Sequence, residues 1–506
     1  MRLNFFKKIG ITIFASLLSV ASLAVAQPAS NPLDIHGLNQ FSIMGVRSRT
    51  MGGTTIANVN DASAIFSNPA ALSRLTKFEV RAGGLFGNTT RQQTQEWVPF
   101  RPVPGLSVLF EGLTGTIKMP TDTVGNPLGP WETLQKQYDN ITPNWDKKTS
   151  NILPISFVAA IPFTFSGFEI AAGIGASQVI NLDQYYQNNN AMTPYLGQQR
   201  PDPYLITNRT DTVHVKWYQY SRAREGSVYG ITPALSVTLL SGFRVGGSVT
   251  VLNGTSDDIE HRVERGHINI AIGNGVGTNF MLDTVYYNQT KTGTSTYTGN
   301  IYNFGLHYND ERYSIGITVR PEMELTRVWN RNVVIIDSTK KTFPVKVDSS
   351  RSYQESGKDY LNFPLSFSLG FVLTPTERWT LAFDYEMSYL SDMKLTTATN
   401  STATRPWSNN RATLRLGAEF RASHMLSLRG GYRDDFQSFS PDGSAYIGEP
   451  AKGGVYSFGA GIVLENILID FGYEYSLLKY QDIYQSNVNY NMREQHNVLM
   501  EVAYRF

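Results

Sequence analysis

Apolar and polar residues alternate along fourteen segments that follow one another from residue 77 to the C-terminus. In the last segment, Val498, Met500 and Val502 share one face, while Asn497 and Glu501 share the other. Successive side chains of a β-strand point to opposite faces, so this period of two predicts strands. The strands are expected at residues 77–88, 152–162, 167–181, 226–240, 242–256, 297–309, 311–328, 360–374, 377–390, 409–421, 424–437, 453–464, 466–480 and 491–506.

The length of these segments and their connections predict a membrane barrel. A soluble strand usually has about five or six residues, whereas a tilted membrane strand needs about ten, plus any extension above the lipid. A soluble β-sandwich would alternate too, but it does not need such long strands. Short turns also alternate with long polar loops, as in outer-membrane barrels. The turns are expected at residues 162–167, 241, 309–311, 375–377, 422–423 and 465, and the loops at 89–151, 182–225, 257–296, 329–359, 391–408, 438–452 and 481–490.

We therefore predict an all-β fold, a 14-stranded antiparallel transmembrane β-barrel with an N-terminal plug, or hatch, inside the lumen. The even number of strands places both termini on the periplasmic side. The expected domains are a signal peptide at residues 1–26, the hatch at 27–76 and the barrel with long extracellular loops at 77–506. The expected location is the outer membrane of a Gram-negative cell.

The N-terminus has the three parts of a secretory signal peptide. Arg2, Lys7 and Lys8 precede an apolar run at residues 9–25, and residues 24–26 form an A-x-A cleavage site, so the mature chain is expected to begin at Gln27. A retained membrane anchor is the alternative, but the run is short for a span. No later apolar run is long enough for a membrane helix.

Composition adds three points. The chain has no cysteine, and its formal net charge of +2 gives no electrostatic case for binding nucleic acid. Aromatic residues make up 12% of the sequence, which suits aromatic girdles at both lipid interfaces. The final strand ends in Tyr504 and Phe506, a pattern that resembles the C-terminal signal of barrels inserted by the outer-membrane assembly machinery. Lipid and that machinery are the expected partners, and a monomer is expected.

The faces predicted to line the lumen carry charges of both signs and many glycines. Arg415, Arg429 and Arg433 are candidates to orient a ligand head group or contact the hatch, because a guanidinium binds a carboxylate bidentately. A structural salt-bridge lattice would explain the same charges. Inward glycines allow either close approach of a plug or a kink in the wall, and the pattern leaves both open. They are Gly173, Gly175, Gly316, Gly370, Gly417, Gly431, Gly459, Gly461 and Gly472.

Catalytic and metal-binding motifs are missing from the sequence. The seven histidines are scattered, and there is no HExxH, GxSxG, phosphate-binding loop or cysteine cluster. GNGVG at residues 273–277 lies in a predicted loop without a strand-to-helix context. We therefore expect no enzyme activity, no metal and no cofactor.

Residues 51–75, MGGTTIANVNDASAIFSNPAALSRL, differ from the alternating strands that follow. Gly52 and Gly53 allow a hinge, Asp61 can cap a short helix at residues 62–66, and Asn68-Pro69 favours a turn. This segment resembles the hatch of FadL-type outer-membrane transporters (the OMPP1/FadL/TodX group), which carry a similar glycine-rich start, D-A-S/G step and NPA motif. The candidate hatch motif comprises Met51, Gly52, Gly53, Asp61, Asn68, Pro69 and Ala70.

The resemblance implies passive uptake of hydrophobic small molecules, such as long-chain fatty acids or hydrocarbons, past a moving hatch. A hatch that never moves is the structural alternative. The alternative function is a FadL-like barrel that binds partners or serves protein secretion. Uptake predicts an apolar tunnel from the loops to the hatch, whereas partner binding predicts a closed lumen and a structured loop surface.

Overall fold

A computed structural model describes residues 38, 41–97, 144–195, 210–273, 278–283, 287–337, 349–404, 410–437, 444–445, 451–484 and 487–506. The predicted signal peptide at residues 1–26 lies outside this part of the chain. The strands are β1 (Glu79–Trp97), β2 (Trp145–Phe165), β3 (Phe168–Asn181), β4 (Gln184–Tyr195), β5 (Thr210–Leu240), β6 (Phe243–Gly273), β7 (Thr278–Asp283), β8 (Tyr287–Asn309), β9 (Tyr313–Arg320), β10 (Met323–Asp337), β11 (Ser349–Phe363), β12 (Ser366–Thr376), β13 (Trp379–Ser388), β14 (Lys394–Thr397), β15 (Asn400–Thr404), β16 (Arg411–Arg421), β17 (Leu426–Gln437), β18 (Ser444–Ala445), β19 (Ala451–Leu464), β20 (Ile467–Tyr484) and β21 (Asn487–Arg505).

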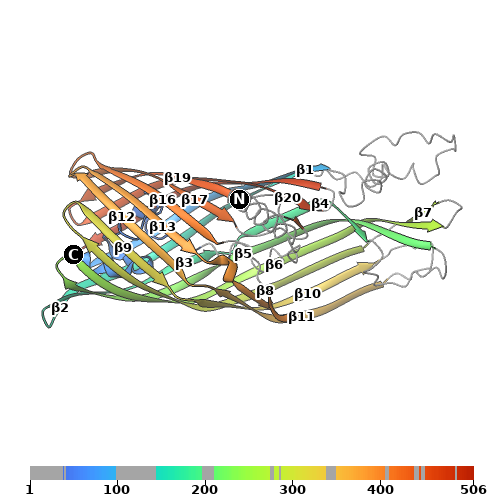
Figure 1. The fold of residues 1–506 in the computed structure, drawn as a ribbon, viewed down its shortest axis with the longest axis horizontal. Helices are drawn as coiled ribbons and strands as arrows, with labels where there is room; N and C mark the ends of the chain where they lie inside the picture. The colour runs from blue at the N-terminus through green and yellow to red at the C-terminus, as the bar shows by residue number, and fades with distance from the viewer. Residues whose placement is uncertain are drawn as a thin grey trace, which may run out of the picture.

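These strands form a closed antiparallel barrel with a wall of 14 strands (Figure 1). In four places two successive strands occupy one position in the wall, so each pair counts as one wall strand. These pairs are β3 with β4, β9 with β10, β11 with β12, and β13 with β14. The short strands β7, β15 and β18 add to β6, β14 and β20. The first and last strands close the ring, in register from Glu79↔Arg505 to Trp97↔Asn487. The predicted fold class is confirmed.

The outer face of the barrel is apolar over the height of a membrane. In β21, Val498, Met500 and Val502 are exposed, while Leu499 and Glu501 point inward and are buried. This arrangement inverts a soluble protein, because the apolar face meets lipid and the polar face meets the lumen. No helix among the described residues has the length and apolar character needed to cross a membrane. The barrel has the architecture of an outer-membrane protein of a Gram-negative cell, as expected.

The predicted long loops are wrong where the described residues form strands; their parts at 98–143, 196–209, 274–277, 284–286, 338–348, 405–409, 438–443, 446–450 and 485–486 lie outside the described residues. β5 and β6 each have 31 residues and are paired from Thr210↔Gly273 to Leu240↔Phe243, so they continue far into the expected loops. Above the lipid, the outer face of a strand meets water, and the apolar alternation that marks a membrane strand is lost. The wall is lower elsewhere in the ring, with 11 residues in β16 and 12 in β17, and Figure 1 shows this difference in height.

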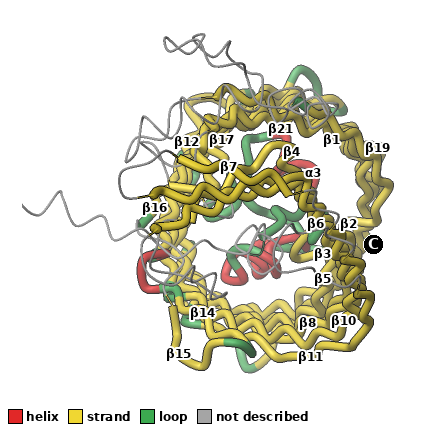
Figure 2. Tube along the Cα trace, turned by 90° about the vertical axis from the view of Figure 1, so that its right-hand side faces the viewer, coloured by secondary structure: helices red, strands yellow, loops and turns green. Residues whose placement is uncertain are grey.

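The N-terminal segment, residues 41–76, lies inside the ring of strands, where Figure 2 shows its short helices in red. These are α3 (Val46–Thr50), η1 (Ala62–Phe66) and η2 (Pro69–Arg74). A further short helix, η4 (Leu390–Asp392), follows β13. The two larger apolar clusters of the described residues lie in the interior. One joins η1 and η2 to β2, β3 and β5, and the other lies higher, between Leu38 and the strands from β3 to β11.

Candidate functional site

The candidate hatch motif forms a chain of tight turns. Gly52 and Gly53 have φ angles of 68° and 81°, a left-handed conformation that side chains disfavour. Asp61 caps η1 by accepting a hydrogen bond of 2.9 Å from the Ser63 amide. Asn68 caps η2 in the same way at 3.2 Å, and Pro69 occupies the first helical position, where its missing N–H costs nothing.

Inward glycines let the backbone of the N-terminal segment touch the backbone of the wall. A Cβ atom at Gly431 would lie 2.0 Å from the Gly52 nitrogen, and one at Gly417 would lie 2.4 Å from the Met51 oxygen. Eight of the nine glycines that we expected to face inward contact this segment. Gly461 instead faces Arg429 and Asp470. Close approach of the N-terminal segment, rather than a kink in the wall, therefore accounts for these eight glycines.

Charged side chains fasten α3 to the wall. Arg47 forms a two-pronged ion pair with Glu419 of β16, with N–O distances of 3.2 and 3.3 Å. Arg49 pairs with Glu474 of β20, and its Nε lies 3.0 Å from the carboxylate. Bidentate pairs of this kind fix geometry as well as charge.

Asp384 of β13 anchors the turn that follows the glycine pair. Its Oδ2 accepts hydrogen bonds from the amides of Thr55 at 2.6 Å and Ile56 at 3.0 Å. Both turn residues are buried, as is Asp384. The wall therefore grips the segment through main-chain as well as side-chain contacts.

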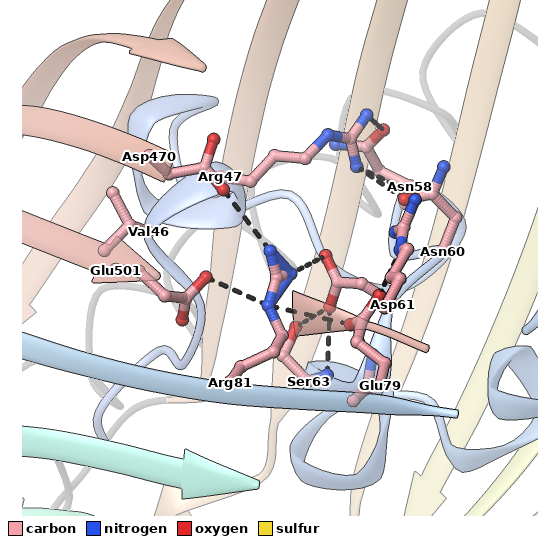
Figure 3. A network of polar contacts seen from close by, with 12 residues as sticks. Val46, Arg47, Asn58, Asn60, Asp61, Ser63, Glu79, Arg81, Asp470 and Glu501 are labelled. Atoms are coloured by element: carbon pink, nitrogen blue, oxygen red, sulfur yellow. Dashed lines mark hydrogen bonds and ion pairs between the residues drawn. The ribbon is translucent and has the colours of Figure 1, made fainter. Parts of the chain in front are cut away.

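A buried network surrounds Arg81 of β1 where the first and last strands meet (Figure 3). Its guanidinium lies 2.8 Å from Asp61, 3.3 Å from Asp470 of β20 and 3.3 Å from Glu501 of β21. Glu79 accepts a hydrogen bond of 2.9 Å from the Ala62 amide and pairs with Arg505 at 2.5 Å. The network thus ties η1 to the seam of the barrel.

The charge of Asp61 is stabilised by this network. Burial alone would raise the pKa of the Asp61 carboxyl, but Arg81, Ser63 and Arg47 together hold that pKa below its ordinary value. Our sequence reasoning did not select Arg81 or Glu79. Their shared face in the expected strand at 77–88 was the signal that could have revealed them.

The three candidate lumen arginines lie in two environments. Arg415 and Arg433 line a cavity above the N-terminal segment, where they pair with Glu386 and Glu474 respectively. Arg429 is not among the residues lining this cavity; it pairs with Glu419 at 2.6 Å and with Asp470. Arg429 thus pairs with two carboxylates of the wall that also bind other arginines: Glu419 binds Arg47 of α3, and Asp470 binds Arg81.

The cavity has a volume of about 380 Å³, and the N-terminal segment forms its floor through Phe41, Thr55 and Ile56, among others. Six arginines and four carboxylates line it, together with many hydroxyl and amide side chains. Leu85, Met44 and Phe66 supply part of its apolar surface. This cavity suits a polar ligand better than a hydrocarbon.

Beside the cavity, the lumen is filled by apolar side chains. Leu38, and Phe41 of the N-terminal segment, pack against buried residues such as Ile180, Leu252 and Tyr297. The segment that follows β13 contributes to the same cluster through Leu390, Met393 and Leu395. Apolar surface in this part of the lumen is therefore already covered by the chain itself.

The expected assembly signal lies at the lower rim. Phe506 donates its amide to the Phe78 carbonyl at 3.0 Å, and its ring lies 4.9 Å from that of Phe78 and 4.7 Å from that of Tyr504. Both signal residues face outward and are exposed. Among the described residues, no group of three or more His, Asp or Glu side chains could hold a metal ion.

Comparison with known proteins adds a partial match to one family model and a likeness of fold. A family model described as BamG matches residues 203–432, which is less than half of the chain. No curated protein matches the sequence.

Two solved structures illustrate the fold. A Pseudomonas aeruginosa FadL homologue has a TM-score of 0.54 at 13% identity, covering 90% of this chain and 96% of its own. The P. putida toluene transporter TodX has a TM-score of 0.51 at 14% identity, covering 92% and 98%. At such identities the likeness concerns the fold: this chain is an outer-membrane barrel with the architecture of FadL-type proteins.

Proposed function

We propose that this chain is a partner-binding outer-membrane barrel that works with the outer-membrane assembly machinery while its lumen stays closed. The observation that carries the proposal is the fastening of the N-terminal segment to β1, β13, β16 and β20 by buried charges and backbone contacts. Movement of the segment would break several buried ion pairs, and separating one such partner from another is strongly destabilising.

Two further observations support a role played outside the lumen. The cavity that a transported molecule would enter is lined by charges rather than by an apolar tunnel. The BamG match, which points toward the assembly machinery, begins at residue 203, ahead of β5, and ends within β17, so it includes the tall wall that rises above the membrane. That wall is an ordered surface on which a partner can dock.

Purification of the tagged chain from its own outer membrane, in a mild detergent, tests this proposal. The central insertion barrel of the assembly machinery should co-purify in a fixed ratio, and depletion of the chain should lower the amounts of other outer-membrane barrels. A tagged, unrelated outer-membrane barrel of equal abundance is the control. The proposal fails if the insertion barrel is recovered equally with both tagged proteins.

The second candidate is uptake of long-chain fatty acids or hydrocarbons past the N-terminal segment. It is favoured by the FadL-type fold and by the position of the cavity directly above the segment. Labelled oleate and toluene, offered to cells and to reconstituted liposomes, would test it. A Gly53→Pro variant should change uptake, because residue 53 has a φ of 81° that proline cannot adopt.

A reversible lock makes the uptake test sharper. Phe41 and Ile180 are bridge partners, so their backbones are close enough for a disulfide, and the chain has no cysteine of its own. In a Phe41→Cys/Ile180→Cys variant, oxidation should stop uptake that requires movement of the segment, and reduction should restore it. Equal uptake in both states, or none by wild type, would argue against a moving hatch.

A further inference from the structure

The lipid-facing side of the barrel has an open apolar groove of about 470 Å³, lined by residues of β12, β13, β16 and β17. Its floor includes the cross-strand pair Ala418 and Gly430. A Cβ atom at Gly430 would have no neighbour closer than 3.9 Å, so the space in front of it is open. Larger side chains, among them Leu381, Leu416 and Tyr432, stand around this floor. The wall therefore presents a depression to the membrane at this place.

A carboxylate without a cationic partner lies directly above the groove. Asp434 follows Tyr432 by two residues along β17, so both side chains lie on the outer side of the strand. Its Oδ1 accepts a hydrogen bond of 3.0 Å from the Tyr432 hydroxyl, and its Oδ2 accepts one of 3.3 Å from the Leu414 amide. Asp434 is half-buried and has no ion pair among the described residues.

The nearest arginines of the lumen do not neutralise Asp434. The pairing of β16 with β17 ends at Arg415↔Arg433. Both of these arginines point into the lumen, where they pair with Glu386 and Glu474 respectively. A carboxylate can accept up to about four hydrogen bonds, and two are accounted for at Asp434. Its negative charge is therefore available to a cation that approaches from outside the barrel.

The height of Asp434 indicates what kind of cation this is. Below it on β17, the outward side chains of Leu426 and Leu428 are apolar and exposed. The rings of Tyr432 and Tyr456 lie 5.2 Å apart just beneath Asp434, and outward tyrosines mark the boundary between hydrocarbon and head groups. A ligand that reaches both the carboxylate and the groove must therefore be amphipathic, with a cationic group above an apolar chain.

We propose that this part of the outer wall binds a membrane lipid whose head group carries an ammonium group. The ammonium group lies at Asp434, and one acyl chain lies in the groove over Ala418 and Gly430. Surrounding lipid chains are as apolar as the groove, so close packing rather than the hydrophobic effect holds the chain. The attraction between opposite charges then sets the preference among lipids. This inference does not depend on the proposed partner, because it concerns the isolated chain.

Native mass spectrometry of the purified full-length barrel tests the site. The protein, in a non-ionic detergent, receives equal amounts of dilauroyl phosphatidylethanolamine and dilauroyl phosphatidylglycerol. Wild type should retain the ethanolamine lipid in preference, by up to about fivefold, as expected for a partly exposed ion pair. Asp434→Asn should retain the two lipids equally. Gly430→Leu fills the groove and should retain less of either lipid.

Matched positions on another strand provide the controls. Asp257 is an exposed carboxylate on the outer side of β6, and Gly247 is an outward glycine of the same strand. Asp257→Asn and Gly247→Leu should therefore retain both lipids like wild type. The compact barrel band on unheated gels confirms that each variant folds.

Each result has a clear meaning. A preference for the ethanolamine lipid that Asp434→Asn removes, together with weaker retention in Gly430→Leu, supports the site. Equal retention of the two lipids by wild type, or a preference that persists in Asp434→Asn, overturns it. Unchanged retention in Gly430→Leu also overturns it. Retention of neither lipid, with a photo-crosslinker at position 430 reacting with another protein in cells, would assign the groove to a protein contact instead.

Discussion

Two parts of the inner wall hold two stretches of the N-terminal chain by different means: one holds α3 with residues 50–52, and the other holds Leu38 with Phe41. On the glycine half, β16, β17, β19 and β20, Gly417 and Gly431 allow main-chain contact with Met51 and Gly52. Gly459 and Gly472 make room for the side chain of Thr50, and acidic side chains bind the arginines of α3. On the apolar half, from β3 to β11, large side chains such as Leu252 and Tyr297 are fully buried against Leu38 and Phe41.

The difference shows how one alternating pattern can serve two purposes. Contacts on the glycine half are so close that no atom can be added, so this half determines position. The apolar half gains free energy in proportion to buried area and accepts small shifts. We therefore expect the glycine and charged contacts to set where the segment sits, and the apolar contacts to add stability.

The largest effect is expected from Arg81→Met. It leaves Asp61, Asp470 and Glu501 buried around a vanished cation, and such a change costs about 3–5 kcal/mol. The free energy of unfolding in urea should fall by that amount, and trypsin should cut at Arg47 and Arg49. Arg81→Lys retains a charge and should lose much less. Wild-type stability of Arg81→Met would show that the charges do not anchor the segment.

Gly431→Val tests whether the close contact between the wall glycines and the N-terminal segment sets the position of that segment. The added Cβ would meet the Gly52 nitrogen at 2.0 Å, so we expect a loss of about 3 kcal/mol and faster cleavage of the N-terminal segment by trypsin. Gly430→Val is the matched control, because its Cβ would point outward with no neighbour nearer than 3.9 Å. Similar cleavage of both variants would contradict the positioning role of Gly431.

Leu252→Ala tests the apolar half. Removal of this buried side chain should lower the free energy of unfolding by about 2–3 kcal/mol through lost burial and a cavity. Trypsin should still find α3 protected, since the contacts on the glycine half remain. Val251→Ala, on the lipid-facing side of β6, should change stability less. Release of α3 in Leu252→Ala would remove the distinction between the two halves.

The smallest effect is expected from pH. Because the folded-state pKa of Asp61 lies below its ordinary value, its contribution is fully present above the unfolded pKa of about 4 and is lost as pH falls through the folded pKa. Protection of α3 from an acid-active protease should therefore decline as the pH falls below about 4. Release near neutral pH would show that another group controls the anchoring.

Sequence reasoning captured the local chemistry of the site closely. Asp61 caps a helix at Ala62–Phe66, and Asn68-Pro69 begins another turn, because capping depends on residues within a few positions of each other. The extent of β5 and β6 was missed, because strands above the membrane lack a lipid-facing apolar row. The pairing of Arg81 with Asp61 was also missed, since partners joined by the closure of a barrel are not marked by spacing.

The sequence by itself determined the strands, their lipid-facing sides, the all-β class and the short turns, because each depends on period two or on neighbouring residues. Only the tertiary structure decided which glycines meet the N-terminal segment, which arginines face the cavity, and how tall each wall rises. These features depend on the stagger and closure of fourteen strands, which place residues hundreds of positions apart in contact.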